Sequence, residues 1–395
     1  MVALTGYPAS GESRLRVAVN LPETEGTASP DAEIRSGISG SDERAVSDSG
    51  SGAQSGESAL KALADYLADD MLACNREIIA RMQSDVPLIP QLAAHLVAAG
   101  GKRLRPLLVL AAARLAGYEE QGEAMRHIGV AACVEFIHTA TLLHDDVVDN
   151  SQLRRGLASA NAVFGNKASV LVGDFLFARA FQILTADGSL PVMAILSAAS
   201  ATLAEGEVMQ MTTQNDLSTS VDRYLQVIYG KTAALFAAAC ETGAVVAGAN
   251  DETREALRLY GANLGMAFQL VDDALDYAAD QAVLGKTVGD DFFEGKVTLP
   301  VLAAYHAGDE EERAFWLRTI ENNDEQKEAD LGRALELIAK TNAIDVTMAR
   351  ARDYADAACE ALDRVSQTMK KMTVHTQPLR QMLMDIARYT ATRSR

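Results

Sequence analysis

From about Ala59 onward, apolar residues recur every three or four positions, as at Leu60, Leu63 and Leu67. This spacing puts apolar side chains on one face of an α-helix, and breaks rich in Gly or Pro divide the pattern into about ten segments. A hydrophobic share of 48% in 395 residues is sufficient for one large core. We therefore predict a single all-α domain over residues 58–395, with no strand-rich region and no short repeat.

The residues that interrupt the pattern give approximate helix boundaries. The expected breaks lie at residues 87–90, 100–101, 117, 187–189, 215–218, 249–251 and 285–296. A helix is expected to start at Ser218 or Ser220, because Asp222 follows in what would be the first turn. The two longest expected helices cover about residues 125–149 and 256–278.

Residues 1–57 differ in composition from the rest of the chain. They are rich in Gly, Ser, Ala and acidic residues and show no sustained periodicity, which predicts a disordered tail with no catalytic role. A transit peptide would be rich in Arg and poor in acidic residues, whereas this tail carries Glu12, Glu23 and Asp31.

Charge and cysteine content exclude several classes of protein. A net charge of −18 argues against nonspecific binding to nucleic acid. The chain has four cysteines, Cys74, Cys133, Cys240 and Cys359. They lie too far apart for a zinc motif, so we expect buried free thiols. No uninterrupted apolar stretch approaches the roughly 18 residues of a spanning helix, and no secretory signal is evident, so we expect a soluble, cytoplasmic protein.

Two aspartate-rich stretches lie within apolar helical runs. They are Asp145-Asp146-Val147-Val148-Asp149 and Asp272-Asp273-Ala274-Leu275-Asp276. Carboxylates four residues apart share a helix face, and clustering them in an apolar helix is costly unless cations compensate. A solvated helix face is the alternative, but the first stretch directly follows the largely apolar run 137–143. Hard oxygen ligands suit Mg²⁺, which usually shares its coordination with substrate phosphates, so the sequence predicts a diphosphate held by magnesium between two helices.

Helical geometry selects the neighbours of these carboxylates. His138 and Thr141 fall on the same stripe as Asp145 and Asp149, which would face a reaction cavity. On the second helix Gln269 shares the stripe of Asp272 and Asp276, and it is either a satisfied core amide or a donor to a substrate oxygen. Asp273 lies off that stripe, where it would hold a metal-bound water.

Basic residues follow or precede glycines at several points. Arg154 and Arg155 come just after the first aspartate stretch, and Lys102 and Arg105 follow Gly100-Gly101 at an expected helix start, where anions are favoured. Lys231, Lys286 and Lys296 each follow a glycine. A nucleotide-binding phosphate loop needs a further glycine five residues before the glycine of its Gly-Lys pair. Here that position is Leu225 for Gly230-Lys231 and Asp280 for Gly285-Lys286, so ATP binding is not implied.

Together these motifs, in this order, identify a family. The chain resembles trans-polyprenyl diphosphate synthases over about residues 60–395, and the segment 135–144 is similar to bacterial long-chain members of the octaprenyl and decaprenyl type. The motifs are the two aspartate stretches, Gly-Lys-Arg-Leu-Arg-Pro at 101–106, Arg154-Arg155, Lys231-Thr232, Lys286 and Gly295-Lys296. The resemblance implies a helical bundle around a central cavity and a homodimer.

The resemblance also implies a reaction and a set of roles. An allylic diphosphate, such as farnesyl diphosphate, ionises, the double bond of isopentenyl diphosphate attacks the carbocation, and a proton is lost. All six aspartates of the two stretches are expected at the metal site, with Asp145, Asp149 and Asp272 holding three Mg²⁺ and acting with Lys231 and Lys286 in catalysis. The allylic diphosphate would be bound by Arg154, Lys231, Thr232, Gln269 and Lys286, and isopentenyl diphosphate by Lys102, Arg105, His138 and Arg155.

In this family, side chains about one turn below the first aspartate stretch set the product length. Those positions are Ala140 and Thr141, and the small Ala140 leaves room for a tail along the helix. Phe136, further down, either forms a floor or fills the core. We expect a C40 to C50 product for the ubiquinone side chain, with transient membrane contact on release and a shorter geranylgeranyl-type product as the alternative.

Three other classes of protein share part of this pattern. A terpene cyclase normally replaces the second aspartate stretch by a mixed Asn/Ser/Glu pattern, and a noncatalytic partner subunit would have lost its aspartates. Both stretches are intact here. A metal-dependent phosphohydrolase would need further histidines in helical register, and the chain has only six histidines.

Overall fold

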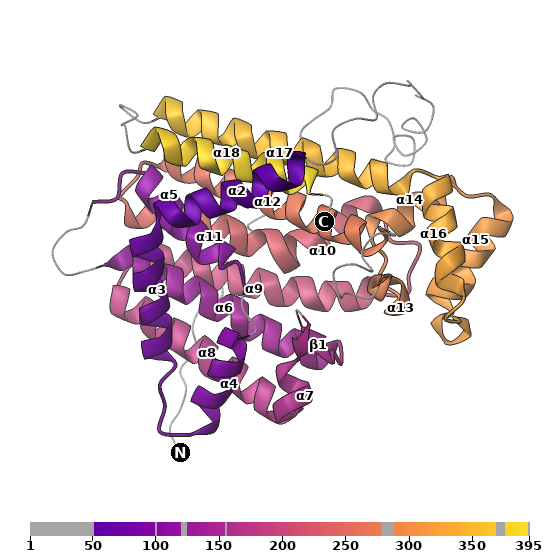
Figure 1. Ribbon diagram of the computed structural model, residues 1–395, viewed down its shortest axis with the longest axis horizontal. Helices are drawn as coiled ribbons and strands as arrows, with labels where there is room; N and C mark the ends of the chain where they lie inside the picture. The colour runs from indigo at the N-terminus through magenta and orange to yellow at the C-terminus, as the bar shows by residue number, and fades with distance from the viewer. Residues whose placement is uncertain are drawn as a thin grey trace, which may run out of the picture.

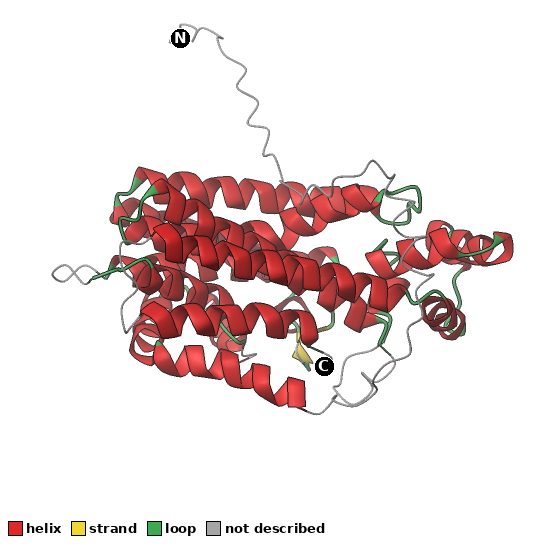
Figure 2. Cartoon of the chain, turned by 90° about the horizontal axis from the view of Figure 1, so that it is seen from above, coloured by secondary structure: helices red, strands yellow, loops and turns green. Residues whose placement is uncertain are grey.

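The computed structural model describes residues 51–98, 101–119, 125–154, 156–278, 288–368 and 376–393. Within these ranges the chain is almost entirely helical, as predicted, and its long helices run roughly side by side (Figures 1 and 2). The first half contains α2 Ser51–Tyr66, α3 Ala68–Arg81, α4 Leu88–Ala98, α5 Leu104–Leu115, α6 Arg126–Val148, β1 Leu153–Arg154, β2 Leu157–Ala158, α7 Ala160–Phe164, α8 Asn166–Asp187 and α9 Leu190–Thr213.

The second half continues the bundle and adds a lobe of shorter helices, which projects at the right of Figure 1. Its elements are α10 Val221–Ile228, the π-helix η1 Tyr229–Ala233, α11 Ala234–Val246, α12 Asp251–Asp276, α13 Asp290–Phe293, α14 Leu299–Ala307, α15 Glu310–Trp316, the π-helix η3 Leu317–Glu321, the 3₁₀-helix η4 Asn323–Glu325, α16 Asp330–Lys340, α17 Ala343–Thr368 and α18 Thr376–Thr392.

Helix ends follow the expected local chemistry. Ser220 caps α10 by accepting a hydrogen bond from the backbone N–H of Arg223, and Asn250 caps α12 in the same way through Thr253. Gly188 ends α8 with φ of 70°, a left-handed conformation that glycine adopts without steric cost. Helix α2 begins at Ser51, inside the segment predicted to be a tail, while residues 1–50 lie outside the described ranges.

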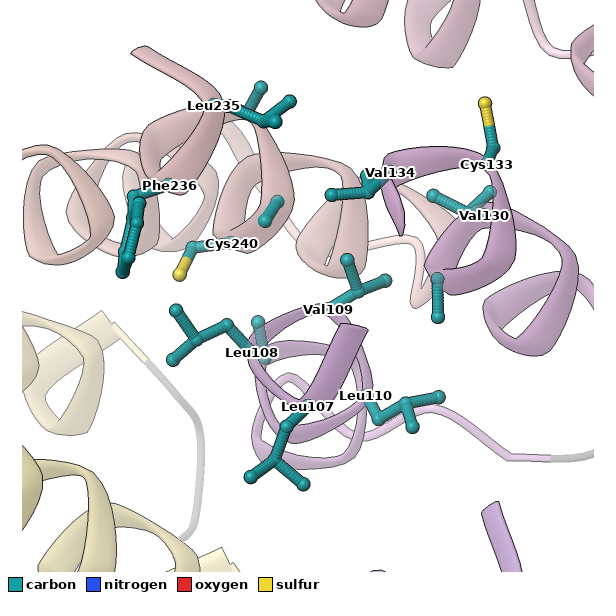
Figure 3. Close-up of a cluster of buried hydrophobic side chains, with 14 of the residues drawn as sticks. Leu107, Leu108, Val109, Leu110, Val130, Cys133, Val134, Leu235, Phe236 and Cys240 are labelled. Atoms are coloured by element: carbon teal, nitrogen blue, oxygen red, sulfur yellow. The ribbon is translucent and has the colours of Figure 1, made fainter. Parts of the chain in front are cut away.

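The core forms where α5 packs between α6 and α11. Figure 3 shows apolar side chains of α5, including Leu108 and Val109, next to Val134 of α6 and Phe236 of α11. Helix α12 packs between α11 and α17 and so runs through the middle of the bundle. All four cysteines are buried and unpaired, as expected.

Two helices, α8 and α9, are more apolar than we expected from the sequence. α8 and α9 are long and apolar enough to cross a membrane by length and composition, although we expected no spanning helix. Within the most apolar window of each, only 39% and 28% of the residues are buried, even though α8 packs on α6 and α9 on α11. Exposed apolar side chains therefore remain on both, including Leu171, Phe181, Val208 and Met211.

Glycines allow the central helices to approach backbone to backbone. A Cβ built on Gly261 of α12 would lie 2.3 Å from the carbonyl oxygen of Phe236, and one on Gly243 of α11 would lie 2.5 Å from that of Val109. No side chain fits at these distances, so α5, α11 and α12 can keep their spacing only with glycine at both positions.

We predict that Gly261→Ala lowers the free energy of unfolding by about 2–3 kcal/mol, because α11 and α12 must separate to admit the methyl group. Gly332→Ala is the matched control, since a Cβ there meets nothing within 4 Å inside α16. Replacing that glycine is expected to stabilise the protein by about 0.5–1 kcal/mol. Urea unfolding of both variants measures the difference, and equal effects would refute the packing argument.

Candidate active site

The first aspartate stretch forms the C-terminal end of α6. Asp149 is the C-cap residue, with its N–H bonded to the carbonyl of Asp145 at 2.8 Å. The C-terminus of a helix carries partial negative charge, so carboxylates at this position are unfavourable without a cation nearby. Asp145 and Asp149 are partly buried, whereas Asp146 is 1% exposed.

Asp146 has a role in the protein itself. It receives a bidentate ion pair from Arg154, with Nη2 at 2.6 Å and Nε at 2.9 Å from Oδ1. Arg154 lies on β1, which pairs antiparallel with β2 around Gly156 at φ of 78°. This small hairpin was not predicted from the sequence, and it turns Arg154 back onto the helix that precedes it. Arg155, predicted to bind isopentenyl diphosphate, lies outside the described residues.

The second aspartate stretch ends α12. Asp273 is buried and accepts hydrogen bonds from Tyr224 Oη at 2.5 Å and Gln269 Nε2 at 2.8 Å, while Thr232 Oγ1 donates to Gln269 Oε1 at 2.8 Å. This chain of contacts joins α10, η1 and α12. The oxygen and the nitrogen of the Gln269 amide are therefore both hydrogen-bonded within the protein. Of the two alternatives for Gln269, the structure shows the satisfied core amide.

A short segment around α13 closes the site against α12. The backbone N–H of Asp291 donates to Asp276 Oδ2 at 3.0 Å, and the Lys296 ammonium lies 3.6 Å from Asp291 Oδ1 and also pairs with Glu294. Asp291 was missed by the sequence reasoning. The available signal was its position between Lys286 and Lys296, both already singled out. Lys286 itself lies outside the described residues.

The remaining cations of the site rest on carboxylates as well. Lys231 of η1 pairs with Glu207 of α9 at 3.0 Å, and Arg393 near the C-terminus pairs with Asp272 while its guanidinium lies 4.9 Å from the centre of the Phe268 ring. A pocket opens beside Lys231. Its lining includes Lys231, Gln269, Asp273, Asp291 and Lys296.

Burial and mutual repulsion shift the acidity of these carboxyls. Burial, assisted by Glu207 and Asp149 and opposed by Lys231, raises the pKa of Asp145 to about 7. Burial and the charge of Asp291 raise the pKa of Asp276 to about 8. Asp149 of α6 also raises the pKa of Lys296, which lies beside Asp291, the residue whose N–H bonds to Asp276 of α12. Among the described residues of this site, carboxyls outnumber cations.

A second group of predicted residues lies at the start of α5. Arg105 Nη1 is 3.0 Å from His138 Nε2, and the Arg105 guanidinium lies 4.6 Å from the centre of the Phe236 ring. Lys102 is exposed at the mouth of this region. Arg103 between them adopts a left-handed conformation with φ of 47°, held by an ion pair to Glu135 at 2.6 Å. The turn thereby brings together Arg105 and His138, two of the residues expected to bind isopentenyl diphosphate.

The residues predicted to set product length lie deeper on α6. Ala140 and Phe136 are fully buried, and Thr141 Oγ1 donates to the carbonyl of His138 at 2.8 Å. One turn below Ala140, Ile137 contributes to a small apolar pocket between α6, α8 and α9. Its other lining residues are Phe177, Ala180, Phe181, Leu184, Leu196, Ser197 and Ser200. Phe136 is not among them.

Comparisons with known proteins agree with this geometry. The sequence model of the family described as polyprenyl synthetase matches residues 86–338. The chain belongs to the polyprenyl synthetase family. It is 45% identical over 336 residues to the octaprenyl diphosphate synthase of Escherichia coli K12, covering 85% of this chain and 99% of that protein.

Two solved structures are similar over the same part of the chain. A decaprenyl diphosphate synthase from Rhodobacter capsulatus has 51% identity and a TM-score of 0.78, covering 85% of this chain and 99% of that one. A polyprenyl synthase from Caulobacter crescentus, complexed with calcium and isoprenyl diphosphate, has 50% identity and a TM-score of 0.78, with coverages of 85% and 98%. The predicted family, the all-α fold and the prenyltransferase class of this enzyme are confirmed.

The donor set fits magnesium only in part. The aspartates supply hard oxygen ligands, yet among the described residues no three carboxyl, imidazole or thiol groups lie close enough to hold a metal ion by themselves. Mg²⁺ commonly takes one or two carboxylates and completes its shell with water and substrate phosphate. The site therefore suits a metal that arrives with a diphosphate.

We predict that the metal-free protein loses thermal stability as the pH rises from about 5 to about 8.5. Asp145, Asp273 and Asp276 have pKa values raised to about 7, 7 and 8, so below these values they are largely protonated in the folded chain, whereas in the unfolded chain they are ionised above about pH 5. Stability present below the unfolded pKa near 4 is thus lost as the pH rises through the folded values. Calorimetry of the wild type and of Asp145→Asn measures the loss, which the variant should reduce. A melting temperature that rises over this range would contradict the assignment.

Proposed function

We propose that this protein is a trans-polyprenyl diphosphate synthase that extends an allylic diphosphate with isopentenyl diphosphate to a C40 to C50 product. The observation that carries the proposal is a pocket lined by Lys231, Lys296 and Asp273 of the second aspartate stretch, with the charges of Asp145 and Asp149 of the first stretch acting on the same two lysines. The octaprenyl and decaprenyl activities named for similar proteins support the long product.

The proposed reaction breaks the C–O bond of the allylic diphosphate and forms a carbon–carbon bond to isopentenyl diphosphate with loss of a proton. Asp145, Asp149 and Asp272 would hold three Mg²⁺, which supply charge that stabilises the departing diphosphate. Lys231 and Arg154 would bind its oxygens from the protein side, Arg154 after exchanging Asp146 for the substrate. We propose that Lys286 also binds the oxygens of the allylic diphosphate.

Isopentenyl diphosphate would bind at the turn before α5. Arg105 and His138 lie 3.0 Å apart there, and the exposed Lys102 adds a second cation. The face of Phe236 supports the Arg105 guanidinium, which fixes its planar donors for a diphosphate. We assign Arg155 to this site as well. Two anion sites of separate origin suit a reaction that joins two diphosphates.

We predict that magnesium and diphosphate bind cooperatively. Because the described residues do not enclose a metal alone, the affinity for Mg²⁺ should rise at least about tenfold when inorganic diphosphate is present. Calorimetric titration with and without inorganic diphosphate measures this coupling, and Asp272→Asn should reduce it. Tight, stoichiometric Mg²⁺ binding to the protein alone would exclude this form of the site.

The product-length assignment rests on Ala140. Its side chain is the smallest that a helix can present toward a passage, and the apolar pocket at Ile137 lies one turn further along α6. We propose that the growing tail follows this path and that Ala140 and Thr141 permit it. Phe136 would contribute only as core beneath the passage.

We expect the wild type, given farnesyl diphosphate, isopentenyl diphosphate and Mg²⁺, to yield products of eight to ten isoprene units. Ala140→Tyr should shorten them sharply while the first condensation continues, because the ring blocks the path below the site. Thin-layer chromatography separates the products. A cyclic hydrocarbon from the wild type would favour a cyclase, no product a partner subunit, and an unchanged ladder in the variant would refute the passage.

The exposed apolar face of α8 and α9 supports a homodimer. Leu171, Phe181, Val208 and Met211 are each more than half exposed, an arrangement typical of a surface that another subunit covers. We propose this assembly, a cytoplasmic location, transient membrane contact when the product leaves, and a role in making the ubiquinone side chain. Sedimentation equilibrium measures the assembly directly.

A further inference from the structure

Helix α9 and the π-helix η1 touch at a pair of glycines. A Cβ built on Gly206 would lie 2.5 Å from the backbone nitrogen of Lys231, and one on Gly230 would lie 2.9 Å from Gly206 Cα. The two backbones are therefore in direct contact at this point. The residue that follows each glycine is charged, and these two side chains, Glu207 and Lys231, form an ion pair of 3.0 Å.

The backbone of η1 is unusual as well as close. Residues Tyr229–Ala233 form a single π-turn between α10 and α11, and such turns occur frequently at functional sites. The turn carries both Lys231 and Thr232, and Thr232 is tied through Gln269 to the buried Asp273. The position of Lys231 is thus fixed at its backbone, while its four-carbon side chain keeps its own freedom.

Among the described residues, Glu207 is the only one that accepts a hydrogen bond from the Lys231 ammonium. Its carboxylate also lies near the first aspartate stretch, because it is the charge that most raises the pKa of Asp145 after burial itself. Lys231 lines the pocket, and the side chains of Glu207 and Lys231 are 28% and 23% exposed, so the pair is accessible to a ligand. None of the sequence motifs contains Glu207.

We propose that Glu207 is a positioning residue for Lys231: it takes one N–H of the ammonium and aims the other two at the leaving diphosphate. An ammonium has three donors, so the pair with Glu207 and contacts with diphosphate oxygens are compatible. A cation whose direction is set beforehand stabilises developing charge without reorganising at the moment of reaction. The inference rests on the proposed function, in which Lys231 binds the allylic diphosphate.

The proposal predicts that Glu207→Ala acts only through Lys231. The substitution should lower kcat about tenfold or more, with a smaller change in KM for the allylic diphosphate, because the cation is still present but no longer directed. Glu207→Gln should retain most of the activity, since its amide oxygen can still accept from the ammonium. In a Lys231→Ala background, Glu207→Ala should cause no further loss.

Glu205→Ala is the matched control, because Glu205 lies on the same helix with an exposed side chain and should leave kcat unchanged. Equal losses from Glu207→Ala with and without Lys231 would overturn the proposal, as would a Gln variant no better than Ala. Binding of inorganic diphosphate with Mg²⁺, measured by calorimetry, repeats the cycle independently of turnover. If the wild type makes no polyprenyl product, the proposed function fails, while this binding cycle still decides the role of Glu207.

Discussion

The clustering of carboxylates at two helix ends is the constraint on which this site depends. The C-termini of α6 and α12 already carry partial negative charge, and each adds aspartates in a largely buried setting. The protein manages this charge by two means. It leaves some carboxyls with raised pKa values, such as Asp145 and Asp276, and it places cations directly on others. Protonation and ion pairing are both reversible, so the charge of the site can change when a ligand binds.

The described cations of the site are each paired with a carboxylate. Arg154 rests on Asp146, Lys231 on Glu207 and Lys296 on Asp291. Each pair costs less than an isolated buried charge, and each can be rearranged when a new anion and its metal ions enter. The free energy of substrate binding is thus the difference between two arrangements in which these cations are paired.

Much of the bundle and both aspartate stretches could be predicted from the sequence, because they depend on local periodicity and on spacings of three or four residues. The caps at Ser220 and Asn250 are of the same local kind. The roles of Asp291 and Glu207 could not be predicted, since each depends on contact between elements that are distant along the chain. The π-turn at η1 and the hairpin of Arg154 arise from the same tertiary packing, which no short pattern records. The site residues beyond these contacts remain predictions.

The position of Arg393 has a practical consequence for handling this enzyme. Its guanidinium lies on Asp272 and over Phe268, so the last described residue of the chain contacts a proposed metal ligand. A purification tag or fusion partner attached at the C-terminus would begin a few residues from a proposed metal ligand. Attachment before α2 would instead use the segment whose sequence gives no sign of a part in the chemistry.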